Sequence, residues 1–420
     1  MYKHVITAAC FSIQAIGIGA HISFGVFFNP LIAEFGWSRA TLSGASSMAF
    51  FLMGLLSIIV GRLNDRIGPR VMMTVTGVLS GLGFLLMSRL DSVWQLYLFY
   101  GVVVGAGLSS IDVITLSTIA RWFDLKRGVM TGVVKVGTGA GYVACPIVAS
   151  LLVSSYGWRT TYFIIGSAVL IILVSLAQVL KRDPSRLGPV EDWQTGKVVG
   201  PAKTDDDETC CERRTVCEPN SAIGGFSFSE ALRTRCFWTI CTANLVFVFC
   251  VMVVIVHIVP YAQDIKISAA TAASILSTIG GVSIVSRLLT GIAIDRIGGK
   301  KVMIFCFCML ITALLWLSIA RSLWALYFFA VIYGLAHGGI FTVVSPMMAE
   351  FFGMSSHGIL LGVVVFAGNL GGSIGPILAG YMFDATGGYS PVFGICLLMS
   401  VLGLALLISL PKTQAITRSV

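Results

Sequence analysis

Charged side chains are scarce in this chain of 420 residues. Asp, Glu, Lys and Arg together make up 11% of it, whereas soluble domains carry about 25%. Hydrophobic residues make up 56%, and the mean hydropathy is +0.92. These values exclude an ordinary soluble enzyme, a disordered chain and a fibrous protein.

Residues that bind metals or form disulfides are also few, with 11 cysteines and 5 histidines. That is too little cysteine for a secreted disulfide scaffold. Cys210, Cys211 and Cys217 lie close together in the sequence, but no histidine near them completes a set of four zinc ligands. We therefore expect no metal site.

Motifs of catalysis and of ATP binding are missing too. The sequence contains no H-E-x-x-H, no G-x-S-x-G and no phosphate-binding P-loop pattern. We therefore expect neither an enzyme nor an ATP-driven pump, and we expect no cofactor.

Long apolar stretches, in contrast, are plentiful. A membrane helix needs about 20 mostly apolar residues. Twelve stretches meet this requirement, at residues 6–31, 40–61, 71–90, 94–119, 128–152, 160–180, 237–262, 270–294, 301–320, 324–349, 358–382 and 389–411. The sequence therefore predicts an all-α membrane protein with twelve transmembrane helices.

A polar segment divides these helices into two groups of six. The division predicts an N-terminal bundle at 1–180, a cytoplasmic linker at 181–235, a C-terminal bundle at 236–411 and a cytoplasmic tail at 412–420. The end of the linker, near 229–235, is typical of a short amphipathic helix on the membrane surface. Arg233 and Arg235 there would face anionic lipid head groups.

The distribution of basic residues predicts the orientation. If both termini are cytoplasmic, 21 of the 28 Lys and Arg residues lie inside and 5 lie outside. Cytoplasmic loops of membrane proteins carry such an excess. The net charge of +9 is then explained by topology, which excludes nucleic acid as a partner and favours a multi-pass protein of the plasma membrane.

The two halves share a repeated motif after their second helices. Residues 61–70 and 291–300 both read G-x-x-x-D-R-x-G-x-[RK]. This pattern resembles the loop motif of the major facilitator superfamily, which implies two six-helix bundles around a central substrate cavity. Carboxylates at these helix ends can meet a neighbouring helix N-terminus, and glycines there allow close helix approach. We expect a conformational latch formed by Gly61, Asp65, Arg66, Gly291, Asp295 and Arg296.

Four further segments, 24–28, 121–141, 230–238 and 384–389, are similar to those of the monocarboxylate porters and their bacterial oxalate:formate relatives. The resemblance implies transport of a small carboxylate, held by an arginine in the eighth span.

The sequence also departs from this family. Region 14–22 lacks the acidic residue and the lysine that animal porters carry in the first span, and Ser283 replaces an aspartate of the eighth. The animal proton-coupling arrangement is therefore not carried over. The eleventh span offers no lysine in 366–372, unlike the oxalate transporter, which argues against a dianionic substrate.

Arg287 is the leading candidate for binding the substrate. It lies eight residues before Asp295, about 12 Å from the helix end at about 1.5 Å per residue. An unpaired guanidinium in hydrocarbon costs several kcal/mol, and a substrate carboxylate would supply its missing partner. The alternative is a structural arginine that pairs across helices or reaches the interface.

Asp112 and Lys135 form a second candidate pair. Their spacing from the span ends places both at about 12–14 Å above the cytoplasmic face, on helices that are neighbours in sequence. The pair could hold two helices in register, or Asp112 could take up a proton when the pair opens. The sequence leaves both readings open.

Weaker candidates complete the predicted site. His21 could relay protons, although a lone histidine in a helix is more often a packing residue. We further expect substrate contacts from Ser283, Tyr333, His337, His257, Asn369, Phe366 and Tyr142, for which a role in packing is also open.

These observations predict a secondary active transporter that moves a monocarboxylate such as L-lactate or pyruvate with a proton, by alternating access. The alternative is an oxalate:formate-type anion exchanger, in which Lys135 would be the second cation. In either case the expected partners are a small organic anion and the lipid bilayer, and we expect a functional monomer.

Overall fold

The computed structural model describes residues 2–123, 126–182, 190–191, 198–199 and 226–410. Most of the predicted linker at 181–235, with Cys210, Cys211 and Cys217, and the tail at 412–420 lie outside the described residues. The described chain is helical apart from β1 (Val190–Glu191) and β2 (Val198–Val199), which pair antiparallel.

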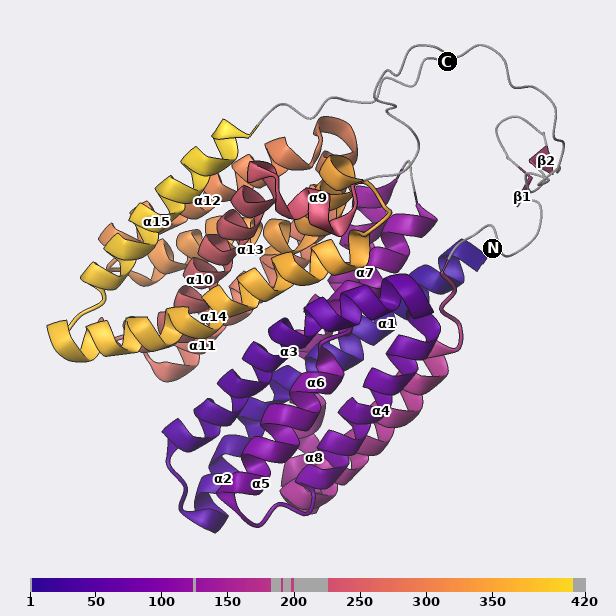
Figure 1. Ribbon diagram of the computed structural model, residues 1–420. Helices are drawn as coiled ribbons and strands as arrows, with labels where there is room; N and C mark the ends of the chain where they lie inside the picture. Colours follow the sequence, from indigo (N-terminus) through magenta and orange to yellow (C-terminus); the bar gives the residue numbers. More distant parts are fainter. Residues whose placement is uncertain (1, 124–125, 183–189, 192–197, 200–225, 411–420) are drawn as a thin grey trace, which may run out of the picture.

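The first half of the chain forms one bundle, coloured indigo to magenta in Figure 1. Its segments are α1 (Tyr2–Ile22), the 3₁₀ helix η1 (Ser23–Phe27), α2 (Phe28–Phe35), α3 (Arg39–Ile67), α4 (Pro69–Met87), α5 (Val93–Leu96), the π-helix η2 (Tyr97–Val104), α6 (Gly105–Leu108), α7 (Ile111–Trp122) and α8 (Arg127–Ala177). The predicted spans 6–31 and 94–119 are therefore interrupted helices.

The second half forms the other bundle, coloured pink to yellow in Figure 1. Its helices are α9 (Phe228–Leu232), α10 (Arg235–Asp264), α11 (Ala269–Ile297), α12 (Gly299–Ile319), α13 (Leu323–Phe352), α14 (His357–Thr386) and α15 (Ser390–Ser409). The short helix α9 lies just before α10, where the sequence predicts an amphipathic helix.

Within the described residues, eleven helical segments are long and apolar enough to cross a membrane. One of them, α8, is 51 residues long and contains two predicted spans, which join at the non-helical Gly157. Counting both parts gives the twelve predicted crossings, and an even number returns the chain to its starting side. We call the side at which α1 begins and α15 ends the terminal side. The charge distribution predicts that it is cytoplasmic.

The internal repeat is visible in α3 and α11, which are both 29 residues long. Each begins after a serine, Ser38 or Ser268, whose hydroxyl accepts the backbone N–H three residues on at 3.1 and 3.3 Å. Each ends at a glycine with positive φ, 99° at Gly68 and 86° at Gly298. A side chain would strain that conformation, so the glycines fix where the motif helices end.

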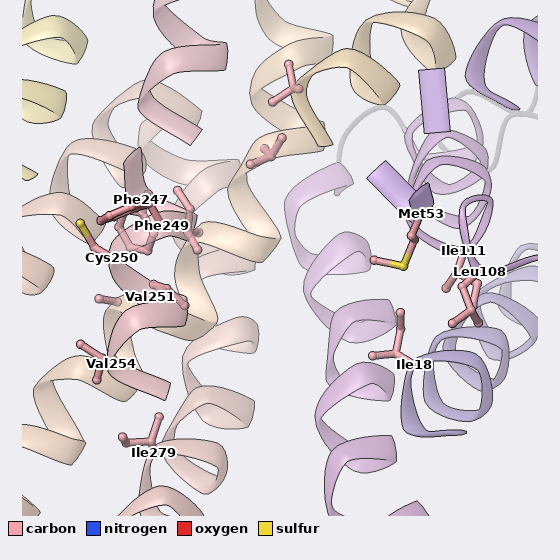
Figure 2. Close-up of a cluster of buried hydrophobic side chains, with 14 of the residues drawn as sticks. Ile18, Met53, Leu108, Ile111, Phe247, Phe249, Cys250, Val251, Val254 and Ile279 are labelled. Carbon is pink, nitrogen blue, oxygen red and sulfur yellow. The ribbon is translucent and has the colours of Figure 1, made fainter. Parts of the chain in front are cut away.

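The apolar core is one cluster with buried residues from both halves, and the side chains labelled in Figure 2 come from both of them. The first half contributes Ile18, Met53, Leu108 and Ile111, and the second half contributes Phe247, Phe249, Cys250, Val251, Val254 and Ile279. The halves meet mainly along two helix pairs, α3 with α14 and α8 with α11, and α7 also contacts α13 and α14. Two bundles joined in this way can rock against each other around a site between them.

Candidate functional site

A cavity lies between the two halves near the middle of the bundle. Its polar wall includes His21, Asp112, Lys135, Thr138, Tyr142, Arg287 and Asn369. Its apolar wall is formed by Ile18, Ile22, Phe50, Met53, Met252 and Phe341. A concave apolar site with a few convergent polar groups is the usual form of a small-molecule site.

Asp112 and Lys135 meet in this cavity. A break in the fourth span, where the Ser109 hydroxyl donates to the Ala106 carbonyl at 2.6 Å, places Asp112 in the first turn of α7. A carboxylate is favoured there by the helix dipole. Lys135 Nζ of α8 lies 2.5 Å from Asp112 Oδ1, and the Lys135 side chain is 4% exposed. The Asp112 side chain is 26% exposed, so the lysine is enclosed by protein while the carboxylate borders the cavity.

Three polar residues surround the ion pair. Gln14 of α1 donates from Nε2 to Asp112 Oδ1 and to Thr115 Oγ1, both at 2.8 Å. The Thr138 hydroxyl donates to Gln14 Oε1 at 2.7 Å. This network is not predicted from the sequence. Its only signal is an amide side chain within an apolar span.

Arg287 of α11 reaches across to the first half. It is 1% exposed, and its Nη1 donates to the Lys135 carbonyl at 2.5 Å. Its Nε has no hydrogen-bond partner among the described residues, and no described carboxylate lies within ion-pairing distance. Arg287 is therefore a buried cation whose charge is not neutralised by direct pairing.

The motif carboxylates lie at the N-termini of helices from the opposite half. Asp65 of α3 accepts the backbone N–H groups of Gly358 and Ile359, at 3.2 and 3.0 Å, and pairs with Arg121 Nη2 at 2.7 Å. Asp295 of α11 accepts those of Gly128 and Val129 in α8, at 2.6 and 2.9 Å. Each aspartate thus satisfies N–H groups that lack a partner within their own helix.

The motif glycines lie at the same two crossings. A Cβ atom on Gly61 would come within 2.3 Å of the Gly358 carbonyl oxygen, and one on Gly291 within 2.6 Å of the Gly128 carbonyl oxygen. The motif arginines Arg66 and Arg296 are instead exposed at the ends of their helices. The close crossings therefore depend on the glycines and aspartates.

Among the described residues, the hydrogen bonds between the halves lie in the region between Arg287 and the terminal side. In addition to the two aspartates, Ser57 donates to the Gly362 carbonyl at 2.8 Å and Ser345 to the Leu116 carbonyl at 3.5 Å. Ser57 and Arg287 are each ten residues from the terminal-side end of their helix. These hydrogen bonds close the protein between the cavity and the terminal side.

Three predicted contact residues on α11 and α13 lie outside the cavity wall. The Ser283 hydroxyl donates to the Gly280 carbonyl at 2.8 Å. The Tyr333 hydroxyl donates to the Val251 carbonyl at 2.6 Å. His337 is 3% exposed and its ring stacks on Tyr333 at a centroid distance of 6.3 Å. The expectation that the polar tips of Tyr333 and His337 line the cavity is not met, because Tyr333 finds its partner in α10.

Two other predicted residues also pack away from the cavity. His257 places Nε2 at 3.1 Å from the Pro376 carbonyl and Nδ1 at 3.1 Å from the Tyr389 hydroxyl, so both ring nitrogens are engaged within the second half. Phe366 packs edge-on against Phe51 at 6.1 Å. His21, Tyr142 and Asn369 are the weaker candidates that do line the cavity.

A second, smaller cavity adjoins the first on its terminal side. Asp112, Lys135, Phe341 and Asn369 line both cavities. The remaining lining residues of the second cavity include Leu116, Asn244, Val344, Leu361 and Val365. The ion pair therefore lies at the boundary between the two cavities.

Comparisons with known proteins agree with this architecture. The family model of the Major Facilitator Superfamily matches residues 7–264 and 240–419. Monocarboxylate transporter 13 of Rattus norvegicus is 27% identical over 409 residues, covering 97% of this chain and 88% of that protein. Monocarboxylate transporter 12 of Mus musculus is 24% identical over 408 residues, covering 93% and 82%.

Solved structures show the same fold. The transporter FucP in the outward conformation aligns with a TM-score of 0.71 at 16% identity, covering 98% of this chain and 100% of that chain. The human organic anion transporter MFSD10 aligns with a TM-score of 0.69 at 14% identity, covering 96% and 99%.

Proposed function

We propose that this chain, which belongs to the major facilitator superfamily and is a multi-pass membrane transporter, moves a small monocarboxylate together with a proton. L-lactate and pyruvate are the model substrates. The similarity to monocarboxylate transporters over most of the chain supports this substrate class.

Arg287 is the observation that carries the proposal. It is 1% exposed and lines the central cavity without an ion-pair partner among the described residues. A buried guanidinium is costly unless an anion neutralises it. A carboxylate that enters the cavity supplies that charge through a forked pair of hydrogen bonds.

The charges of the cavity favour a monoanion. Asp112 and Lys135 neutralise each other at 2.5 Å, so the net charge is that of Arg287. While Asp112 is ionised, one carboxylate neutralises the cavity, whereas a dicarboxylate would leave an unpaired negative charge in a site of low dielectric.

Asp112 is the proposed proton carrier. When it takes up a proton, Lys135 loses its ion-pair partner and becomes available to the substrate carboxylate beside Arg287. The loaded carrier then holds one more proton and one more anion than the empty carrier, so the translocation is electroneutral. Asp112 lines both cavities, so a proton that enters either of them can reach it.

Alternating access requires the terminal side to open. Asp65 and Asp295 would then release the N-termini of α14 and α8, and the two bundles would rock about the cavity. The contacts between the halves described above support a carrier that is closed on the terminal side and loads from the opposite side. No chemical step is part of this cycle.

Labelled L-lactate uptake into liposomes containing the purified protein tests the proposal. Symport predicts accumulation that is driven by an inward proton gradient and lost when the gradient is dissipated. Uptake of neither L-lactate nor pyruvate under a gradient would contradict the monocarboxylate assignment.

Anion exchange is the second candidate, because Lys135 gives the cavity a second cation. An exchanger would ignore the proton gradient and require a trapped counter-anion. Symport is preferred because the Lys135 charge is already neutralised by Asp112.

A further inference from the structure

His21 lines the same cavity as Arg287, and the transport cycle above gives it no role. It is the second-to-last residue of α1 and is 7% exposed. Its ring stacks against Phe50 and Tyr100, with centroids at 6.4 and 5.8 Å and interplanar angles of 12° in both cases. The plane of the imidazole is therefore fixed by packing.

The Tyr100 hydroxyl makes two contacts with His21. It lies 3.0 Å from the His21 carbonyl oxygen and 2.9 Å from His21 Nδ1. A carbonyl oxygen has no proton, so the hydroxyl must be the donor in the first contact. When the single hydroxyl proton points to the carbonyl oxygen, Nδ1–H donates to the phenol oxygen in the second contact.

The opposite arrangement is unfavourable. If the hydroxyl donated to Nδ1, the phenol and carbonyl oxygens would face each other at 3.0 Å without a proton between them. The His21 carbonyl lies in the last turn of α1, where carbonyl groups lack an α-helical partner and gain from an external donor. Tyr100 thus selects the neutral tautomer that carries its proton on Nδ1.

In that tautomer Nε2 is an acceptor only. No described protein group forms a hydrogen bond with Nε2, and the ring lines the cavity. The cations of the cavity, Arg287 and Lys135, are donors that suit carboxylate oxygens. Asp112 is already engaged by Lys135 and Gln14. Thr138, Tyr142 and Asn369 also line the cavity, but their side chains can donate as well as accept, whereas His21 Nε2 in this tautomer is a neutral acceptor only.

We infer that His21, positioned by Tyr100, makes the carrier selective for hydroxy monocarboxylates such as L-lactate over the matching oxo acids such as pyruvate. The substrate hydroxyl donates to Nε2, whereas a keto oxygen is an acceptor and would oppose the Nε2 lone pair. Unpaired polar groups of this kind are the main source of discrimination between similar substrates. The inference rests on the proposed function and specifies its substrate class.

Calorimetric titration of the full-length protein with L-lactate and with pyruvate tests the inference. The wild type is expected to bind L-lactate about three- to tenfold more tightly, the range of one ordinary hydrogen bond. Tyr100→Phe removes the group that selects the tautomer, so Nε2 can carry the proton and the preference is lost. His21→Gln also loses it, because an amide offers both a donor and an acceptor.

Tyr162→Phe is the matched control. Its hydroxyl is buried without a partner in the described structure, and its ring stacks on Phe27 at 3.9 Å, away from the cavity wall. This variant should keep the wild-type preference. Retained pyruvate binding by Tyr100→Phe and His21→Gln shows that both variants are folded.

Two results overturn the inference and leave the transporter proposal intact. One is equal affinity of the wild type for L-lactate and pyruvate. The other is an unchanged preference in both Tyr100→Phe and His21→Gln. Binding of neither acid by the wild type would overturn the proposed function, and this inference with it.

Discussion

Lys135 contacts both other charged groups of the cavity. Its side chain pairs with Asp112, and its backbone carbonyl accepts a hydrogen bond from Arg287. The Lys135 carbonyl accepts a hydrogen bond of 2.5 Å from Arg287 Nη1, while its Nζ lies 2.5 Å from Asp112 Oδ1. The ion pair and the position of the guanidinium therefore depend on the same residue. This relationship is the physical basis for coupling the proton to the anion in the proposed cycle.

Neutralising Asp112 should separate coupling from exchange. In Asp112→Asn the residue can no longer release a proton, so we expect gradient-driven L-lactate uptake to be abolished. Exchange of labelled for unlabelled L-lactate, which needs no net proton movement, should persist. Uptake assays in liposomes measure both, with the exposed Asp384→Asn as a control that should retain both activities. Gradient-driven accumulation by Asp112→Asn would show that another group carries the proton.

Loss of the Asp65 charge should loosen the terminal side. A hydrogen bond to a charged group is worth about 1.5–3 kcal/mol, so Asp65→Asn should speed amide hydrogen exchange at residues 358–359 by about tenfold or more. Mass spectrometry of the peptides that cover these residues measures the effect.

Glu350→Gln is the matched control for this experiment. Glu350 accepts the Gly299 N–H at 2.9 and 3.0 Å, within the second half. Its neutralisation should leave exchange at 358–359 unchanged. Equal exchange in Asp65→Asn and the wild type would mean that the aspartate does not hold the two halves together.

A methyl group at the motif glycine should separate α3 from α14. Gly61→Ala places a Cβ atom within 2.3 Å of a backbone oxygen of α14, and overpacking of this kind costs about 1–3 kcal/mol. That cost applies to the state that is closed on the terminal side, in which α3 and α14 cross closely. We therefore expect L-lactate uptake to fall by at least about fivefold. Gly394→Ala, where a Cβ would have no neighbour within 4 Å, should transport normally. Normal uptake by Gly61→Ala would argue against a role for this crossing.

The amide of Gln14 should stabilise the first half. In Gln14→Leu, Thr115 and Thr138 lose a partner in a buried site, and unsatisfied buried groups cost about 1–3 kcal/mol each. The melting temperature, followed by intrinsic fluorescence, should fall by several degrees. Gln263→Leu, at an exposed position, should melt like the wild type. A Gln14→Leu protein as stable as the wild type would show that the network contributes nothing to the fold.

Features that depend on position along a helix were predictable from the sequence. Counting residues from the span ends places Asp112 and Lys135 at one depth, and the structure brings them within 2.5 Å. The repeated motif likewise indicates that Asp65 and Asp295 meet helix N-termini, as they do. The first inference needs only the rise per residue and the alternation of helix direction, and the second needs the repeated motif and the attraction of a carboxylate to a helix N-terminus.

The direction in which a side chain points around its helix axis, and the local breaks within a helix, were not predictable from the sequence. The same helical period allows Tyr333 to face the cavity or α10, and the choice is made by the Val251 carbonyl. Gln14 could not be assigned a role because its partners are 98 to 124 residues away in the sequence. The break that places Asp112 in the first turn of α7 depends on serine hydroxyl contacts, which have no distinctive sequence pattern.

The central claim, that Arg287 holds the substrate carboxylate, is tested most directly by calorimetric binding of L-lactate to the purified protein. We expect binding to the wild type and to Arg62→Gln, which changes an exposed arginine of the first repeated motif. We also expect a loss of about 100-fold in Arg287→Gln, because a desolvated charge pair is worth several kcal/mol, and no binding of uncharged lactamide. Wild-type affinity for L-lactate in Arg287→Gln would contradict the account.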